Sequence, residues 1–402
     1  MGTQEIQAMN ILVRRFTCIA AIVFLVFASQ PAPPIAQPAQ VTKTPALDVL
    51  KERLQKKLDA YCVEYDLPGG VVGFVLSDGQ EGAVAAGFSD LEVKKPMTVR
   101  DRLLSGSIGK TYVSAVALQL VGEKKLDLDA KISNWFEEEK WFPQLPNGKD
   151  ITVRMLMNHT SGIPEHVRLP EFGKAVGENP DHVWKPVELL EYILDKKPLF
   201  PAGKGWAYAD TNYIVLAMIL ETITDRTYYE ELRLRVLKPL DLKDTVPSDN
   251  RTIPGLVPGY AGKQTPFRIP GKTIREGKFV VNPQAEWTGG GLACTTLDLA
   301  RWAWMIHQGK AFPDRLRDQY LDGVPAFTGE GDRYGLGVQI WKSAHGTCLG
   351  HGGWFPGYLS LMAYYPESKL AVAIQFNTDR SIGSMGILRS MLDAFAGILI
   401  EK

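Results

Sequence analysis

The spacing of apolar residues changes along the chain, and this spacing predicts where helices and strands lie. Residues 46–65 carry apolar side chains at helical spacing, which predicts an amphipathic helix. Two short apolar runs then flank Asp78-Gly79, a pattern typical of a β-hairpin. A largely apolar segment from Ile108 to about Gly122 predicts a buried helix.

The C-terminal third contains short apolar runs that are typical of strands. These runs are RYGLGVQIW, GYLSLMAYYP and KLAVAIQFN, and Pro366-Glu367-Ser368 marks the turn between the last two. A final helix is predicted over about 382–400. Residues 125–285 instead indicate helices joined by loops rich in proline and glycine.

This order of elements predicts an α/β (α+β) fold rather than a series of parallel βαβ units. Strands at both chain ends indicate one antiparallel sheet, flanked by the terminal helices. The expected domain spans 45–400, with a sheet subdomain from about 45–106 and 290–400 and a mainly helical subdomain from about 107–289. A ligand site is expected in the cleft between the two subdomains.

The first 44 residues follow a different pattern. Arg14 and Arg15 precede an apolar run from Phe16 to Ala28, and small and proline-rich residues follow. This arrangement predicts a signal peptide over 1–29, cleaved near Ala28 or Ser29, and a disordered spacer over 30–44. We therefore expect an exported protein, periplasmic or extracellular, with no stable membrane span; an uncleaved N-terminal membrane anchor is the alternative.

Composition excludes some classes of partner. The 402 residues contain 45 Lys and Arg and 45 Asp and Glu, so no bulk charge attracts nucleic acid. The six histidines contain no zinc-binding spacing, and the cysteines that remain after cleavage form no metal knuckle. We expect free thiols, no metal and no cofactor.

Ser107 and Lys110 form a Ser-x-x-Lys motif at the predicted start of the buried helix. The simple interpretation is that Ser107 caps the helix. The alternative is that Lys110, one turn on, places an amine beside the Ser107 hydroxyl, an arrangement that activates a serine as a nucleophile.

Two further segments carry candidate chemistry. Tyr208 stands before a predicted helix in the pattern Tyr-Ala-Asp, and an adjacent ammonium would lower the pKa of its phenol. His351-Gly352-Gly353 lies at a predicted strand edge, where glycines allow a substrate backbone to approach. Taken alone, Tyr208 is more simply explained as a packing residue, whereas the His351-Gly352-Gly353 segment fits an ordinary turn equally well.

In this order the three elements resemble the active-site motifs of the penicillin-recognising serine hydrolases. That superfamily includes class C β-lactamases, D-alanyl-D-alanine carboxypeptidases, and related esterases and D-aminopeptidases. The resemblance covers about 45–400 and implies a β-lactamase/DD-peptidase-like fold with catalytic Ser107, Lys110 and Tyr208. It also implies substrate binding by Asp210, His351 and Gly353, with backbone N–H groups of Ser107 and Trp354 stabilising an oxyanion.

Two positions depart from the class C pattern. His351 replaces the usual lysine and offers less positive charge near neutral pH, and Asp210 replaces the usual asparagine and loses its amide donor. We therefore expect a D-alanyl-D-alanine carboxypeptidase-like peptidase or an esterase that acts on a peptide or other small-molecule substrate, and substrates with a free amino group are included. The alternatives are a class C-type β-lactamase and a non-catalytic cell-wall-binding module.

Overall fold

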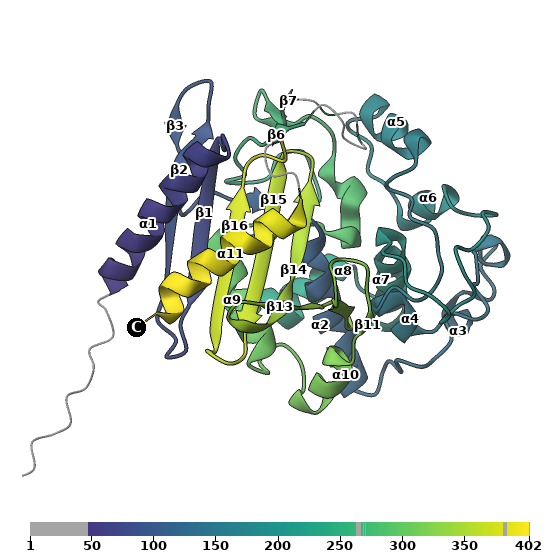
Figure 1. Ribbon diagram of the computed structural model, residues 1–402. Helices are drawn as coiled ribbons and strands as arrows, with labels where there is room; N and C mark the ends of the chain where they lie inside the picture. The colour runs from purple at the N-terminus through teal and green to yellow at the C-terminus, as the bar shows by residue number, and fades with distance from the viewer. Residues whose placement is uncertain (1–46, 263–266, 268, 270, 381–383, 402) are drawn as a thin grey trace, which may run out of the picture. The chain divides into compact units, whose positions relative to one another are not determined.

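A nine-stranded antiparallel sheet organises the protein (Figure 1). The computed structural model describes residues 47–262, 267, 269, 271–380 and 384–401. The strand order is β11-β12-β13-β14-β15-β16-β1-β2-β3. The bounds are β1 (Gly69–Val75), β2 (Glu81–Asp90), β3 (Lys95–Pro96), β11 (Val324–Pro325), β12 (Arg333–Tyr334), β13 (Gln339–Ser343), β14 (Gly346–Phe355), β15 (Tyr358–Tyr365) and β16 (Leu370–Phe376).

The two ends of the domain meet at the centre of this sheet. Strand β1 pairs with β16, with Val72 opposite Ile374, and every residue of both strands is buried. Continuous apolar runs of this kind suit strands that are covered on both faces. The predicted single antiparallel sheet, built from both chain ends, is confirmed.

Helices cover both faces of the sheet. Helices α1 (Leu47–Glu64) and α11 (Met385–Ile400) share one apolar cluster with the sheet, and they lie side by side on its near face in Figure 1. On the other face α9 (Thr296–His307) begins against β1, where a Cβ at Gly73 would lie 2.5 Å from the Thr296 carbonyl oxygen. Trp302 of α9 stacks on Tyr112 of α2 (Gly109–Gly122) at 4.1 Å between ring centroids.

The middle of the chain forms helices, loops and several very short strands. The remaining helices are α3 (Ser133–Phe136), α4 (Val153–Met157), α5 (Pro170–Glu178), α6 (Pro186–Glu191), α7 (Asp210–Thr224), α8 (Tyr228–Leu232) and α10 (Arg317–Leu321), with short helical segments η1 (Gly106–Ile108), η2 (Phe142–Gln144), η3 (Arg233–Leu237), η4 (Pro283–Gly289) and η5 (Asp314–Leu316). The short strands are β4 (Leu103–Leu104), β5 (Thr245–Pro247), β6 (Tyr260–Ala261), β7 (Gly271–Lys272), β8 (Ile274–Arg275), β9 (Lys278–Phe279) and β10 (Leu292–Cys294). The sequence did not predict these strands, because two or three residues show no recognisable period.

One predicted strand is wrong in its continuity. The run RYGLGVQIW is divided into β12 and β13 by a turn, in which Gly335 N–H donates to the Val338 carbonyl and Gly337 has a φ of +88°. Glycine adopts this left-handed conformation without the steric cost that other residues meet. After this turn β13 begins at Gln339, opposite Gly350, so the second half of β14 has no strand partner on that side.

The predictions for the cysteines and for a membrane span can be compared with the described residues, whereas the prediction for the N-terminus cannot. Cys62, Cys294 and Cys348 are free, as predicted. Within the described ranges no helix is long and apolar enough to cross a membrane. The predicted signal peptide and spacer lie outside the described residues.

Candidate active site

Ser107 lies in a helical turn that leads directly into α2. It belongs to η1, and no side-chain cap is formed at the start of η1 or of α2. Instead, the Ser107 Oγ accepts a hydrogen bond from Lys110 Nζ at 3.1 Å. The capping interpretation is therefore wrong, and the hydroxyl–amine pair is formed.

Lys110 is a buried ammonium with three acceptors. Its Nζ donates to Ser107 Oγ, to Asp210 Oδ1 at 2.6 Å and to the Gly289 carbonyl oxygen. Burial alone would lower the pKa of Lys110, but the Asp210 carboxylate outweighs it and raises that pKa. Since all three N–H bonds are used, Lys110 is charged in the resting site and is not a free base.

Tyr208 lies beside this ammonium. Lys110 Nζ is 4.9 Å from the Tyr208 ring centroid, and the Tyr208 hydroxyl lacks a hydrogen-bond partner within the described part of the chain. Burial raises the pKa of Tyr208 to about 12, although Lys110 acts to lower it and Asp210 acts to raise it. The expected lowering of the Tyr208 pKa is therefore wrong for the resting site, because burial outweighs the nearby ammonium.

His351 is buried in β14, and both of its ring nitrogens are hydrogen-bonded. The Nδ1 lies 2.6 Å from the Gly352 carbonyl oxygen, which can only accept, so Nδ1 carries the hydrogen. The Nε2 then accepts from the Tyr334 hydroxyl at 2.8 Å. Burial, reinforced by Lys110, lowers the pKa of His351 to about 3, so this histidine is neutral.

The second half of β14, which has no strand partner on the β13 side, lies against the turn that contains Ser107. A Cβ at Gly353 would lie 1.9 Å from the Ser105 carbonyl oxygen, and one at Gly106, with its φ of +53°, would lie 2.6 Å from Trp354 N. The close neighbour of Gly353 is thus the protein's own backbone, whereas the sequence suggested a substrate. Glycine at both positions allows this approach.

The backbone N–H of Trp354 points away from β15. Gly352 N–H donates to the Gln339 side chain on the β13 side, and N–H groups two residues apart along a strand point the same way. Trp354 N–H therefore faces the open edge beside Ser107. The arrangement supplies the second donor that an oxyanion hole requires.

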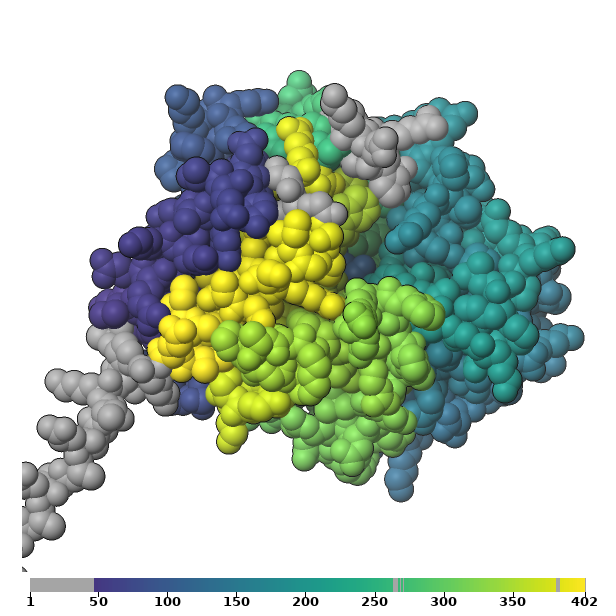
Figure 2. Space-filling view, viewed as in Figure 1, coloured from purple at the N-terminus to yellow at the C-terminus, as the bar shows by residue number. Residues whose placement is uncertain are grey.

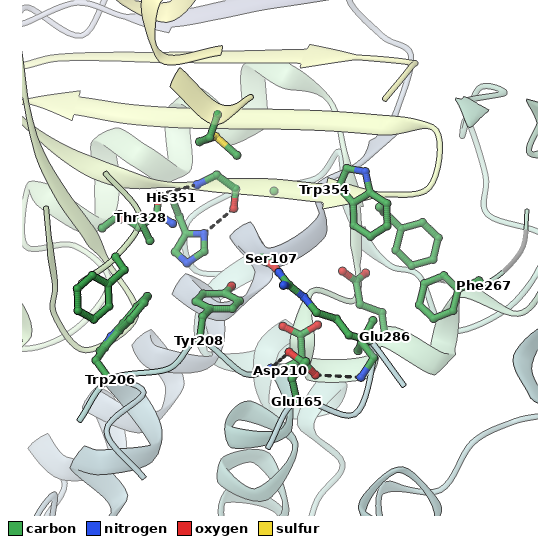
Figure 3. Close-up of a pocket in the computed structure, with 18 residues that line it drawn as sticks. Ser107, Glu165, Trp206, Tyr208, Asp210, Phe267, Glu286, Thr328, His351 and Trp354 are labelled. Atoms are coloured by element: carbon green, nitrogen blue, oxygen red, sulfur yellow. Dashed lines mark hydrogen bonds between the residues drawn. The ribbon is translucent and has the colours of Figure 1, made fainter. Parts of the chain in front are cut away.

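Three carboxyl groups lie around Ser107 in Figure 3: Asp210 and Glu165 below it, and Glu286 to its right. Burial, with repulsion from Asp210, raises the pKa of Glu165 to about 7. Burial also raises the pKa of Glu286 to about 8, although the hydrogen bond that Gly291 N–H donates to Glu286 Oε2, at 3.0 Å, acts to lower that pKa. This side of the site is suited to receiving a cation.

Aromatic side chains form the walls of the cavity, which has a volume of about 400 Å³. Trp206 lies on one side of Ser107 and Trp354 and Phe267 on the other (Figure 3). In Figure 2 the surface is hollowed where the yellow-green C-terminal third meets the teal middle of the chain. A cavity of this volume, with aromatic walls and polar groups that converge on one point, is typical of a small-molecule site.

The structure therefore brings all seven predicted site residues together: Ser107, Lys110, Tyr208, Asp210, His351, Gly353 and Trp354. The sequence missed Glu165, Glu286, Arg168 and Tyr334. Glu165 follows the segment HTSGIP, which carried the family resemblance, so its position was a usable signal. Glu286 stands in a loop with no motif, and only the fold places it at the site.

Comparison with known families agrees with this geometry. The sequence model of the Beta-lactamase family matches residues 48–390. The chain belongs to the Beta-lactamase family. It is a serine hydrolase of the penicillin-recognising superfamily, as the motifs predicted.

Characterised relatives of this β-lactamase-family chain include peptidases and penicillin-binding proteins. It is 27% identical to a D-aminopeptidase from Brucella anthropi over 78% of this chain and 56% of the relative. It is 23% identical to penicillin-binding protein 4* from Bacillus subtilis over 70% of this chain and 62% of the relative. The chain thus spans less than two thirds of the length of either protein.

Solved structures of the family share the fold. A D-stereospecific amidohydrolase from Streptomyces superimposes with a TM-score of 0.73 at 26% identity, covering 86% of this chain and 99% of the other. The D-amino acid amidase of Ochrobactrum anthropi, complexed with L-phenylalanine amide, gives a TM-score of 0.75 at 23% identity over 88% and 99% of the two chains. The predicted β-lactamase/DD-peptidase-like fold is confirmed.

Proposed function

We propose that this protein is an amidase or aminopeptidase that forms an acyl-Ser107 intermediate from substrates with a free amino group next to the scissile carbonyl. The observation that carries this proposal is the group of three carboxyls, Glu165, Asp210 and Glu286, beside Ser107. The names of the relatives, D-aminopeptidase and D-stereospecific amidohydrolase, support it and suggest the D configuration.

A substrate ammonium fits this group of carboxyls electrostatically. Asp210 is already paired with Lys110, whereas Glu165 and Glu286 are held near neutrality by burial and repulsion. An entering cation removes that repulsion and favours ionisation of both carboxyls. Charge-assisted hydrogen bonds from the ammonium then fix the scissile carbonyl near Ser107.

The state of His351 argues against recognition of a carboxylate at the third motif. A neutral histidine with both nitrogens hydrogen-bonded offers neither charge nor a free donor. Class C β-lactamases resemble this chain but carry a lysine there. We therefore favour the aminopeptidase activity over both the carboxypeptidase-like activity that the sequence favoured and β-lactam hydrolysis.

Tyr208 is the base in the proposed mechanism. Lys110 cannot take the proton from Ser107, because its raised pKa keeps it an ammonium, which already carries three protons and has no lone pair. The substrate ammonium offsets the Asp210 charge that raises the Tyr208 pKa, so substrate binding makes the phenolate more accessible. Tyr208 first releases its own proton to solvent; as the bond from Ser107 Oγ to the carbonyl carbon forms, the serine proton moves to the Tyr208 phenolate oxygen.

The remaining steps return that proton and release the product. The tetrahedral oxyanion accepts hydrogen bonds from Ser107 N–H and Trp354 N–H. Tyr208 donates its proton to the leaving amine as the C–N bond breaks. A water molecule then attacks the acyl-serine and gives a proton to Tyr208, which passes it to Ser107 as the acid leaves.

Intact mass measured over time tests the acyl-enzyme. Wild type and Ser107→Ala are each mixed with D-phenylalanine amide, N-acetyl-D-phenylalanine amide, L-phenylalanine amide or benzylpenicillin. We expect Ser107-dependent turnover of the first substrate, with at least tenfold lower kcat/KM for the N-acetylated amide. Equal kcat/KM for the free and acetylated amines would contradict the amine site.

We also propose that the hydrolase acts outside the cytoplasm. The proposal is supported by the sequence pattern of Arg14, Arg15 and the apolar run that follows them. The N-terminus of the protein recovered from its source cells tests it, and a new N-terminus near residue 29 or 30 is expected. A mature chain that still begins at Met1 and remains in the cytoplasm would refute it.

A further inference from the structure

We propose that Arg168 binds a carboxylate on the leaving group, so that the preferred substrate is a short peptide with both ends free rather than a simple amide. The proposal rests on the proposed function and names its substrate class. It concerns binding of the leaving group and adds no covalent step to the mechanism above.

The cavity lining carries charges of both signs. Besides the three carboxyls, the lining includes one guanidinium, that of Arg168, and no lysine. Lys110 lies behind Ser107 with its three N–H bonds used, and His351 is neutral. Among the described residues, Arg168 is therefore the cation available to a bound ligand.

Arg168 is also uncommitted. It is exposed, and the described residues give its guanidinium no ion pair and no hydrogen bond. This contrasts with Arg154, whose guanidinium holds Asp129 at 2.7 Å and 2.9 Å. A guanidinium presents a planar pair of donors that matches a carboxylate, so an unused one at a cavity wall is suited to binding that group.

The rest of the cavity indicates which substrate carboxylate reaches Arg168. The ammonium end is assigned to Glu165 and Glu286, and the walls on either side of Ser107 are aromatic. Aromatic walls suit an apolar acyl side chain and disfavour an acidic one. The carboxylate therefore belongs to the residue that leaves, one peptide unit beyond the scissile bond.

Matched substrates test this assignment. The kcat/KM ratio of D-phenylalanyl-glycine to D-phenylalanyl-glycinamide measures the contribution of the C-terminal carboxylate, since the two peptides differ only in that group. We expect wild type to prefer the free peptide, and Arg168→Gln to reduce the ratio about tenfold, mainly through the KM of the free peptide. Arg168→Lys should recover part of the ratio, because an ammonium keeps the charge but loses the paired donors.

Salt provides a readout that a purely structural role of Arg168 would not change. Because this ion pair is partly exposed, 1 M sodium chloride should lower the ratio in wild type and leave it unchanged in Arg168→Gln. Arg100→Gln is the matched control, since Arg100 is exposed and does not line the cavity. It should keep the wild-type ratio.

The outcomes separate this inference from the proposed function. If D-phenylalanine amide is hydrolysed through Ser107 but Arg168→Gln leaves the peptide ratio unchanged, the assignment of Arg168 fails and the proposed function stands. If no amine-bearing substrate acylates Ser107, the proposed function fails. If wild type prefers D-aspartic acid amide to D-asparagine amide and Arg168→Gln removes that preference, the carboxylate is a side chain of the acyl residue and the leaving-group assignment is overturned.

Discussion

The Lys110 ammonium lies 2.6 Å from the Asp210 carboxylate, and this ion pair is buried directly behind Ser107. The superfamily pattern usually has asparagine at the position of Asp210. An ionised aspartate only accepts hydrogen bonds, whereas asparagine also donates. The ion pair therefore holds Lys110 in its charged form, and the ionised Asp210 offers no amide donor to a substrate.

Asp210→Asn should change which substrate is turned over. The variant regains an amide donor and loses the charge that raises the pKa of Glu165 and of Glu286. We expect benzylpenicillin hydrolysis to rise at least tenfold relative to hydrolysis of D-phenylalanine amide. Steady-state rates for both substrates measure this ratio, and an unchanged ratio would show that Asp210 does not discriminate between them.

Tyr208→Phe should separate chemistry from folding. The phenylalanine ring keeps the packing on His159, 4.3 Å away between centroids, while the base is lost. We expect kcat to fall about 10²- to 10⁴-fold, with Tm within about 2 °C of wild type. Tyr228→Phe is the matched control, because its hydroxyl is also buried and unpaired in the described part of the chain but lies outside the cavity. Retained activity in Tyr208→Phe would exclude it as the base.

Glu286→Gln should stabilise the protein increasingly as pH rises. Burial raises the pKa of Glu286 from an ordinary value near 4.5 to about 8, so the folded state keeps a proton that the unfolded state releases. Between these values the unfolded state binds fewer protons, and this carboxyl lowers the free energy of unfolding as pH increases. The difference reaches a few kcal/mol, as an order of magnitude, by pH 8 and then stays constant.

Thermal unfolding of Glu286→Gln and wild type across pH 4 to 9 checks this dependence. The Tm advantage of the variant should be small near pH 4 and grow up to pH 8. The exposed Glu138→Gln serves as control and should show no such growth. A constant difference between Glu286→Gln and wild type over the whole range would show that Glu286 titrates normally.

Arg389→Met should loosen one wall of the cavity. Arg389 of α11 holds the buried Asp332 at 2.8 Å, and Asp332 in turn accepts from Thr328 at 2.6 Å, in the segment that brings Thr328 and Phe327 to the cavity. Leaving Asp332 without its counter-ion costs about 3–5 kcal/mol, and we expect a higher KM with a smaller change in kcat.

The double variant Arg389→Met with Asp332→Asn provides the control. It leaves no unpaired buried charge, so it should recover much of the free energy of unfolding while KM stays high. Denaturant unfolding and steady-state kinetics measure the two effects separately. A single variant as stable as wild type would show that the ion pair does not hold this wall.

The sequence predicted the sheet and the three motifs because each depends on local patterns. Strand periodicity identified β1, β2, β15 and β16, and the Ser107 motif is the sole Ser-x-x-Lys in the sequence. The pKa of Tyr208 was predicted in the wrong direction, because the sequence showed the nearby lysine but not the depth of burial.

Other site residues depend on contacts that no local pattern reveals. Glu286 reaches the cavity from η4, where Trp287 has a φ of +38°, a conformation that is rare for a bulky residue. Tyr334 meets His351 only because the β12–β13 turn returns the chain beside β14. These positions follow from tertiary packing, which the spacing of apolar residues along a single sequence does not reveal.

The pairing of β1 with β16 has a consequence for the nascent chain on the ribosome. Ser107 and Lys110 emerge early, yet Trp354 and the strand that supports it follow much later in the chain. Contacts between such distant segments also form slowly, because a long loop must close first. In the mechanism proposed above, a chain released before β14 is made would therefore carry Ser107 without the second oxyanion donor, Trp354 N–H.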